Sequence, residues 1–229
     1  MLALLYDVHG NLPALEAVLA DAEANGADRI LLGGDLALAG AWPKETVDRL
    51  RELPQEATWI RGNADRWLVD RHDLPDTELM QRAAADAVER LGEEAARALA
   101  SLPEHATLDG VRYCHASPAG DMESFLPQPA DGEERLLDGV EERRVVFGHT
   151  HLPFRRVRPG GIELVNPGSV GLPFDGDPRP AYALVRDDGE VEHRRVGYDH
   201  ERAAAQLRER LGDWAETFAR RIERGRFDV

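Results

Sequence analysis

The chain has 229 residues, a formal net charge of -15 at pH 7 and a single cysteine, Cys114. This length suits one domain over residues 1–229 with a core of its own. The charge would repel long polyanions unless basic side chains gathered on one face, and no basic cluster is visible, so nucleic acid is not an expected substrate. Cys114 lies in an apolar run, which indicates a buried side chain rather than a nucleophile. Without a membrane-length apolar segment or a signal pattern, we expect a cytoplasmic protein with no membrane partner.

The amino-terminal half predicts strands that alternate with helices. Three apolar runs predict strands over residues 2–6, 30–32 and 58–60. Asn11 is expected to cap a helix with Pro13 in its first turn, and a second helix is expected over residues 43–53. This alternation predicts parallel strands joined by right-handed crossovers.

An insertion interrupts this rhythm over residues 66–108, and its apolar spacing predicts a long helical stretch over about 77–102, which we interpret as a helical cap. Strands are then predicted over residues 111–114, 145–147, 162–165, 181–186 and 191–196, which implies a second sheet. Asp187-Asp188-Gly189 predicts a hairpin turn between the last two strands. An amphipathic helix is expected over residues 201–224, docked on the body in preference to a second subunit. The chain is a monomer or a homo-oligomer.

Side chains suited to binding metals follow five of these strands. They are Asp7, His9, Asp35, Asn63, His115, His149 and His151. The carboxyl ends of strands open onto a common crevice, so we expect these residues to converge. If the chain after residue 6 stays extended, Asp7 and His9 point the same way, and His149 and His151 do so only if Thr150 is extended. Each short motif alone is common in turns, but their ordered conjunction indicates one site.

The donor set indicates which ions such a site would hold. Asp35 offers two oxygens and is the natural bridging carboxylate, while Asn63 adds a neutral oxygen. Mixed oxygen and imidazole donors favour two divalent transition-metal ions (Mn, Fe, Zn, Co or Ni) over Mg or Ca.

These motifs resemble those of the calcineurin-like metallophosphoesterases. The resemblance covers about residues 1–186 and implies an α/β (α+β) fold, a four-layer α-β-β-α sandwich with two metals at its edge. It also implies that one ion is held by Asp7, His9, Asp35 and His151, and the other by Asp35, Asn63, His115 and His149. The segment from Asn166 to Gly171 looks like the branch of small YfcE-type phosphodiesterases and diadenosine-tetraphosphatase-like proteins.

The chain departs from the broader family at two positions. Ala64 stands where other branches have the histidine credited with protonating the leaving oxygen, and Ala39 stands where the Ser/Thr phosphatases have a phosphate-binding arginine. The resemblance therefore favours small phosphodiesters or nucleoside polyphosphates with good leaving groups over phosphoproteins.

The mechanism expected for two metals about 3.5 to 4 Å apart is in-line attack by a metal-bound, bridging hydroxide. Asp35, Asn63 and His115 are then the catalytic ligands, and Asp65 and Arg61 are further candidates, with Asn11 and Ser169 as residues that orient ligands or contact phosphate. The alternatives are a phosphomonoesterase or protein phosphatase, a nuclease, and a non-catalytic metal-binding scaffold like the retromer subunit that resembles this branch.

Overall fold

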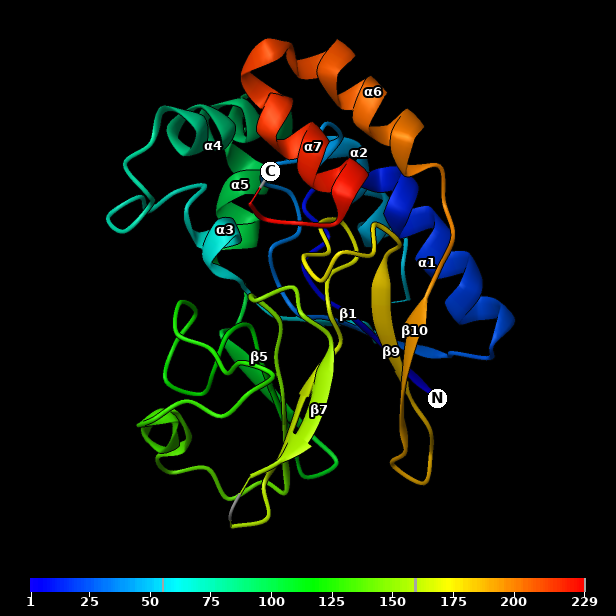
Figure 1. Cartoon of the computed structure of the whole chain (residues 1–229), viewed down its shortest axis with the longest axis vertical. Helices are drawn as coiled ribbons and strands as arrows, with labels where there is room; N and C mark the ends of the chain where they lie inside the picture. Colours follow the sequence, from blue (N-terminus) through cyan, green and yellow to red (C-terminus); the bar gives the residue numbers. More distant parts are fainter. Residues whose placement is uncertain (55, 159, 229) are drawn as a thin grey trace.

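The computed structural model describes residues 1–54, 56–158 and 160–228. Two five-stranded sheets form its centre, with strand orders β10-β9-β1-β2-β3 and β4-β5-β6-β8-β7. Figure 1 shows helices gathered beyond the first sheet and the second sheet on the opposite side of the molecule. The predicted mixed α/β sandwich is confirmed.

The first sheet contains the parallel strands expected from the amino-terminal half. Strands β1 (Leu2–Leu5), β2 (Arg29–Leu32) and β3 (Thr58–Trp59) pair in parallel, and α1 (Leu12–Ala24) and α2 (Pro43–Arg51) connect them. The side chain of Asn11 accepts a hydrogen bond from the backbone N–H of Ala14, so the predicted helix cap is confirmed. Strands β9 (Ala181–Val185) and β10 (Val191–Arg195) complete the sheet as the predicted antiparallel hairpin.

The second sheet includes two strands that the sequence did not reveal. Strands β5 (Val111–Cys114), β6 (Arg144–Val146) and β8 (Glu163–Asn166) lie at three of the apolar runs that predicted strands, and they pair in parallel. Strands β4 (His105–Leu108) and β7 (Phe154–Val157) are the antiparallel edges. Both edge strands alternate exposed and half-buried residues over only four positions, and so short a pattern gives a weak strand signal.

Glycine divides each of the two long helices that were expected. Residues 78–100 form α4 (Glu78–Leu91) and α5 (Glu93–Ala100), separated by Gly92 with φ 81°. The carboxyl-terminal region forms α6 (His200–Leu211), a 3-10 turn η2 (Asp213–Ala215) and α7 (Glu216–Arg224), with Gly212 also at φ 81°. A positive φ ends a helix, because helical residues have a negative φ. Glycine is the residue that adopts a positive φ without steric cost. The helical stretch over about 77–102 is therefore two helices, and the prediction of one helix over residues 201–224 was wrong.

Three apolar layers hold these elements together. Helices α1, α2, α4, α6 and α7 bury side chains against the outer face of the first sheet, among them Leu207 and Ile222 of the docked carboxyl-terminal pair. A second layer, including Leu4 and Val146, lies between the sheets. The outer face of the second sheet is covered by loops and the 3-10 helix η1 (Glu133–Leu137), with no α-helix there in the part of the chain that the structure describes. In those same residues, no helix is both long and apolar enough to cross a membrane.

Candidate metal centre

The seven predicted ligands lie just beyond strand ends, where both sheets reach the same edge. Asp7 and His9 follow β1, Asp35 follows β2, and Asn63 opens the short helix α3 (Asn63–Arg66) after β3. In the second sheet, one histidine follows β5 and two follow β6: His115, His149 and His151.

Most of these ligands have strained backbone conformations. Asp7, His9, Asp35, His149 and His151 have φ between 50° and 66°, the left-handed region that non-glycine residues rarely adopt. The expectation of an extended segment through Asp7 and His9 was therefore wrong, because each ligand is presented by a tight turn. Such strain costs about 1–3 kcal/mol per residue and persists only where the surroundings enforce it.

Hydrogen bonds from neighbouring loops enforce these turns. The backbone N–H of His9 donates to the carbonyl of Asp35 at 2.8 Å. The Asp65 carboxylate accepts from the backbone N–H groups of Asp35, Leu36 and Gly62 at 2.8 to 2.9 Å. The side chain of Asp65 thus bonds to backbone amides of Asp35, Leu36 and the adjacent Gly62 loop, which makes it a positioning residue.

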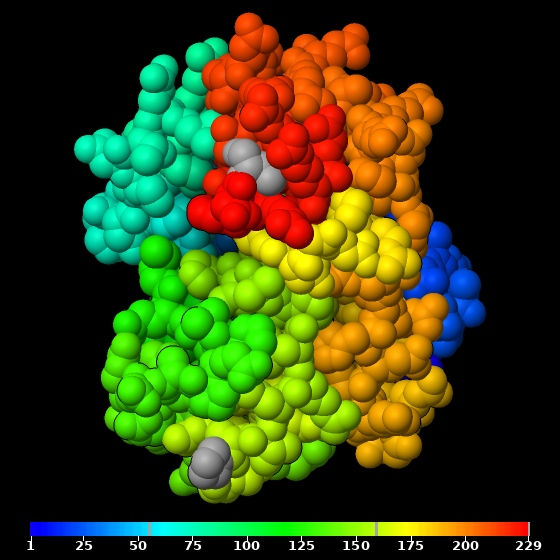
Figure 2. Space-filling view, in the orientation of Figure 1, coloured from blue at the N-terminus to red at the C-terminus, as the bar shows by residue number. Residues whose placement is uncertain are grey.

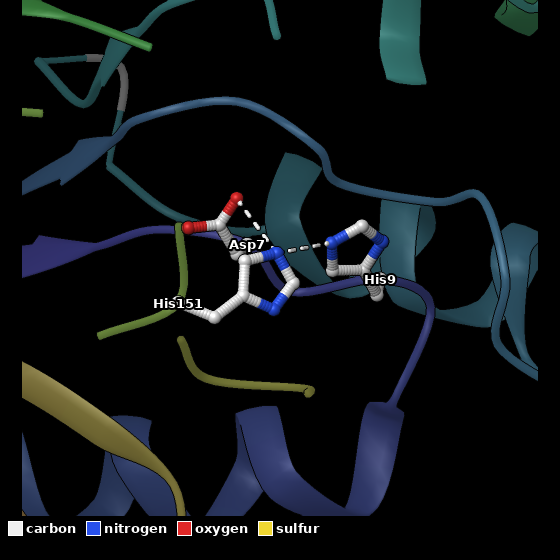
Figure 3. Close-up of side chains that lie close together, drawn as sticks. All are labelled: Asp7, His9 and His151. Atoms are coloured by element: carbon white, nitrogen blue, oxygen red, sulfur yellow. Dashed lines mark hydrogen bonds and ion pairs between the residues drawn. The ribbon is translucent and has the colours of Figure 1, made fainter. Parts of the chain in front are cut away.

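Three histidines turn one ring nitrogen towards the backbone and the other towards the centre of the site. Nδ1 of His9 and of His115 each lie 2.9 Å from a backbone carbonyl, and Nδ1 of His151 hydrogen-bonds the carbonyl of Leu172. A carbonyl can only accept, so each Nδ1 carries a proton, and a ring that is otherwise neutral presents a lone pair at Nε2. Nε2 of His9 and Nε2 of His151 lie 3.2 Å apart, beside Asp7 (Figure 3).

Two buried carboxylates face these lone pairs. Oδ1 of Asp7 has no hydrogen-bond partner among the described residues and lies 3.5 Å from Nε2 of His151 and 3.9 Å from Nε2 of His115. The oxygens of Asp35 lie 3.7 Å from Nε2 of His9 and 3.4 Å from Nε2 of His115. Asp7 therefore groups with His9 and His151 and also with Asp35 and His115, although the resemblance assigned it to one ion alone.

Asn63 and His149 close the other side of the site. The Asn63 amide lies 2.9 Å from both Nε2 of His115 and Nδ1 of His149. The backbone N–H of His149 donates to Oδ2 of Asp7 at 3.1 Å. All seven predicted ligands thus belong to one contiguous cluster.

This cluster fits cations. Lone pairs that face one another across 3.2 Å repel, and an unpaired buried carboxylate oxygen is costly, so both features call for a positive charge between them. A backbone carbonyl that accepts from Nδ1, as at these three histidines, is a contact typical of histidines that bind metals through Nε2.

The charges of the cluster depend strongly on burial. Burial raises the pKa of Asp7 well above its ordinary value and lowers the pKa of His9 and His151. Burial also acts to lower the pKa of His115, but the carboxylate of Asp35 outweighs it and raises that pKa to about 10. Without a cation, the site therefore holds a proton on His115.

The remaining candidates are occupied by other contacts. Arg61 forms an ion pair with Glu104 at 2.6 Å. Both residues line a surface pocket that also includes His115. The amide nitrogen of Asn11 donates to the carbonyl of Gly171 and the hydroxyl of Tyr198, so it supports the loop rather than facing the cluster. Ser169 donates to the carbonyl of Asp7 at 2.8 Å and positions that turn.

Sequence reasoning missed Phe174, whose ring stacks on the ring of His151 with centroids 4.3 Å apart and planes 8° apart. It also missed an ion pair between Arg66, which follows Asn63 by one turn of α3, and Asp121 at 2.8 Å. No local pattern marks either contact, because each joins segments that are far apart in the chain.

Comparison with known proteins decides the family. A model of the calcineurin-like phosphoesterase superfamily domain matches residues 1–189. The chain belongs to the calcineurin-like phosphoesterase superfamily. It is 30% identical to phosphodiesterase YfcE of Escherichia coli K12, over 80% of this chain and 85% of that protein. It is also 29% identical to the uncharacterized protein MJ0912 of Methanocaldococcus jannaschii, over 93% and 95% of the two chains.

The solved structures agree with this membership. The crystal structure of a metallophosphoesterase from Sphaerobacter thermophilus superposes with a TM-score of 0.83 at 29% identity and covers 98% of both chains. The expected phosphoesterase family and sandwich are thereby confirmed, and a metal-dependent phosphoric ester hydrolase is the activity that the family supports.

Proposed function

We propose that this protein is a binuclear metal-dependent phosphodiesterase that hydrolyses small phosphodiesters or nucleoside polyphosphates. One observation carries the proposal: buried carboxylates and imidazoles converge on one place, where the lone pairs at Nε2 of His9 and His151 face each other beside Asp7. The similarity to a protein named phosphodiesterase YfcE supports phosphodiesters as the substrate class.

The protein's own residues would divide the work as follows. Asp7, His9, Asp35 and His151 would hold one ion, and Asp35, Asn63, His115 and His149 the other, with Asp7 close to both groups. Bound there, two divalent transition-metal ions would acidify water and neutralise charge on the phosphoryl group. Mn, Fe, Zn, Co and Ni suit this mixed donor set. Asp65 would keep Asp35 in place through the hydrogen bonds that its carboxylate accepts from three backbone N–H groups.

Proton donation to the leaving group limits the substrates. Ala64 is 2% exposed and lines the cavity next to Asn63, so no side chain at this position supplies an acid. Nitrophenolate and phosphate leaving groups need little protonation, whereas alkoxides need much, and acid catalysis is typically worth about 10²–10⁴-fold. We therefore expect a preference for good leaving groups.

A substrate screen tests the proposal. The purified protein, stripped with chelator and reloaded separately with Mn, Zn, Co or Ni, is assayed on bis-p-nitrophenyl phosphate, p-nitrophenyl phosphate, cyclic nucleotides and dinucleoside polyphosphates. The expected result is metal-dependent turnover that is fastest on the activated diester or the polyphosphates.

Other outcomes would point elsewhere. Preference for the monoester would favour a phosphatase, and metal binding without turnover of any ester would favour a scaffold. Hydrolysis of DNA or RNA with a steep salt dependence would reveal a basic surface and favour a nuclease. Asp35→Asn serves as the matched inactive control in each assay.

A further inference from the structure

A largely apolar cavity of about 410 Å³ opens beside the metal centre and includes His9, His149 and His151 in its wall. The rest of the wall comes from distant segments. Trp67, Leu79 and Met80 belong to the helical insertion, and Phe218 and Arg221 belong to α7. In the space-filling view the carboxyl-terminal residues, in red, lie between α4, in blue-green, and the yellow segment that follows β8 (Figure 2).

Arg221 is the cationic side chain of this wall, and aromatic rings surround it. Its Cζ lies 4.1 Å from the ring centroid of Phe227, 5.8 Å from that of Phe218 and 5.9 Å from that of Phe174. Nε donates to the carbonyl of Phe227 at 3.1 Å. Cation–π contacts of this kind fix the plane of a guanidinium without occupying its N–H donors.

The terminal nitrogens of Arg221 have no acceptor among residues 1–54, 56–158 and 160–228. Among the described residues, no carboxylate lies within 4.0 Å of this guanidinium, and only Nε finds an acceptor. Three other arginines of the same helices are paired: Arg208 with Glu216 and Glu223, Arg210 with Glu45, and Arg220 with Glu216. Arg202 and Arg224 form no ion pair with a described residue, but both are exposed and lie outside the cavity wall. A half-buried arginine without a carboxylate, in a cavity, is suited to bind an anion.

One ring connects Arg221 to the metal centre. The ring centroid of Phe174 lies 5.9 Å from Cζ of Arg221, and the same ring stacks on His151 with centroids 4.3 Å apart. Arg221, His9 and His151 line the same cavity. Both α7 and Phe227 fall outside residues 1–189, the part that the family model matches.

We propose that this cavity is a specificity subsite, in which the apolar wall receives an aromatic non-leaving group of a phosphodiester and Arg221 binds a non-bridging oxygen of the same ester. The inference rests on the proposed function and names its substrate class: aryl-type diesters rather than small alkyl diesters. Burial of a phenyl group on this wall is expected to improve binding by about tenfold or more over a methyl group.

Two substrates with one leaving group test the subsite. Phenyl p-nitrophenyl phosphate and methyl p-nitrophenyl phosphate both release p-nitrophenolate, so a difference between them reports the non-leaving group alone. The wild type should show a KM about tenfold lower for the phenyl ester, with similar kcat for both.

Variants separate the two parts of the proposal. Arg221→Gln should raise KM for both esters by about tenfold, Arg221→Lys should recover part of that loss, and Arg220→Gln is the matched control on the same helix. Phe227→Ala should reduce the phenyl preference, and because this side chain is 60% exposed, its truncation leaves the core intact. Equal KM for the two esters in the wild type, or an Arg221→Gln protein that behaves like Arg220→Gln, would overturn the proposal.

A binding measurement keeps the subsite testable if turnover is absent. Calorimetry of the metal-loaded protein with phenylphosphonate and methylphosphonate should show about tenfold tighter binding of the phenyl compound, lost in Phe227→Ala and weakened in Arg221→Gln. Turnover of esters without this binding preference would sink the subsite and leave the proposed function standing. Tighter binding of the phenyl compound without turnover of any ester would support the subsite and contradict the proposed function.

Discussion

Nε2 of His9 and Nε2 of His151 face each other at 3.2 Å, while Nδ1 of each ring is fixed to a backbone carbonyl. Neither nitrogen can donate to the other in this arrangement, so the pair is unfavourable unless a cation lies between the lone pairs. The folded protein thus contains a repulsive contact between these two nitrogens, and an ion bound between them would increase the free energy of unfolding.

The first prediction concerns the number of ions. Under metal-replete conditions the wild type should hold two transition-metal ions per chain by elemental analysis. Asp35→Asn should lose both, because the two oxygens of Asp35 face His9 and His115, one from each ligand group. Asp48→Asn, at an exposed site on α2, is the control. A wild-type content well below one ion would refute the assignment, and full occupancy in Asp35→Asn would refute the bridging role.

The second prediction concerns protons. His115, with its pKa raised to about 10 by Asp35, carries a proton at pH 8 in the metal-free protein, and coordination through Nε2 must displace it. Metal uptake at pH 8 should release at least about one proton, and affinity should rise by about tenfold per pH unit between pH 7 and pH 8.5, because fewer protons then compete. Calorimetry in two buffers of different ionisation enthalpy measures the release. Uptake without proton release would contradict the proton on His115.

The third prediction tests how tightly the loops around Asp35 are packed. A Cβ added at Gly62 would lie 2.1 Å from Oδ1 of Asp35, so Gly62→Ala must displace that carboxylate. Metal affinity should fall by about 10–100-fold. At Gly197 an added Cβ meets nothing within 4 Å, and Gly197→Ala is the matched control. Equal metal affinities in the two variants would show that Asp35 is free to move.

The fourth prediction uses the vacancy at Ala64. Ala64→His places an imidazole beside Asn63, in the wall of the cavity. Activity on alkyl monoesters or cyclic nucleotides should rise, up to about 100-fold, while activity on nitrophenyl diesters changes little, because acid catalysis helps poor leaving groups most. Ala20→His, at an exposed position on α1, controls for the added side chain. If the wild type already cleaves alkyl esters as fast as activated ones and the substitution alters neither, another residue donates the proton.

The sequence by itself determined which side chains gather and where. An apolar run that ends in Asp, Asn or His can be identified locally, and parallel strands deliver their ends to one edge whatever the details of the loops. The positions of Asp7, Asp35 and His149 could therefore be predicted, as could the parallel half of the first sheet and the docking of the carboxyl-terminal region. The helix breaks at Gly92 and Gly212 could have been suspected from the glycines themselves. They were missed because the apolar spacing typical of a helix continues on both sides of each glycine.

Only the tertiary structure decided how those side chains are presented. The left-handed turns at Asp7 and His9, and the ring nitrogen that each histidine offers, depend on carbonyls and amides from loops elsewhere in the chain. The same holds for Arg221, whose lack of a described carboxylate partner and proximity to Phe174 cannot be read from a charged residue on an amphipathic helix. Local patterns encode the period and polarity of an element, whereas strain, tautomer and cavity walls arise from contacts between elements that only the folded chain brings together.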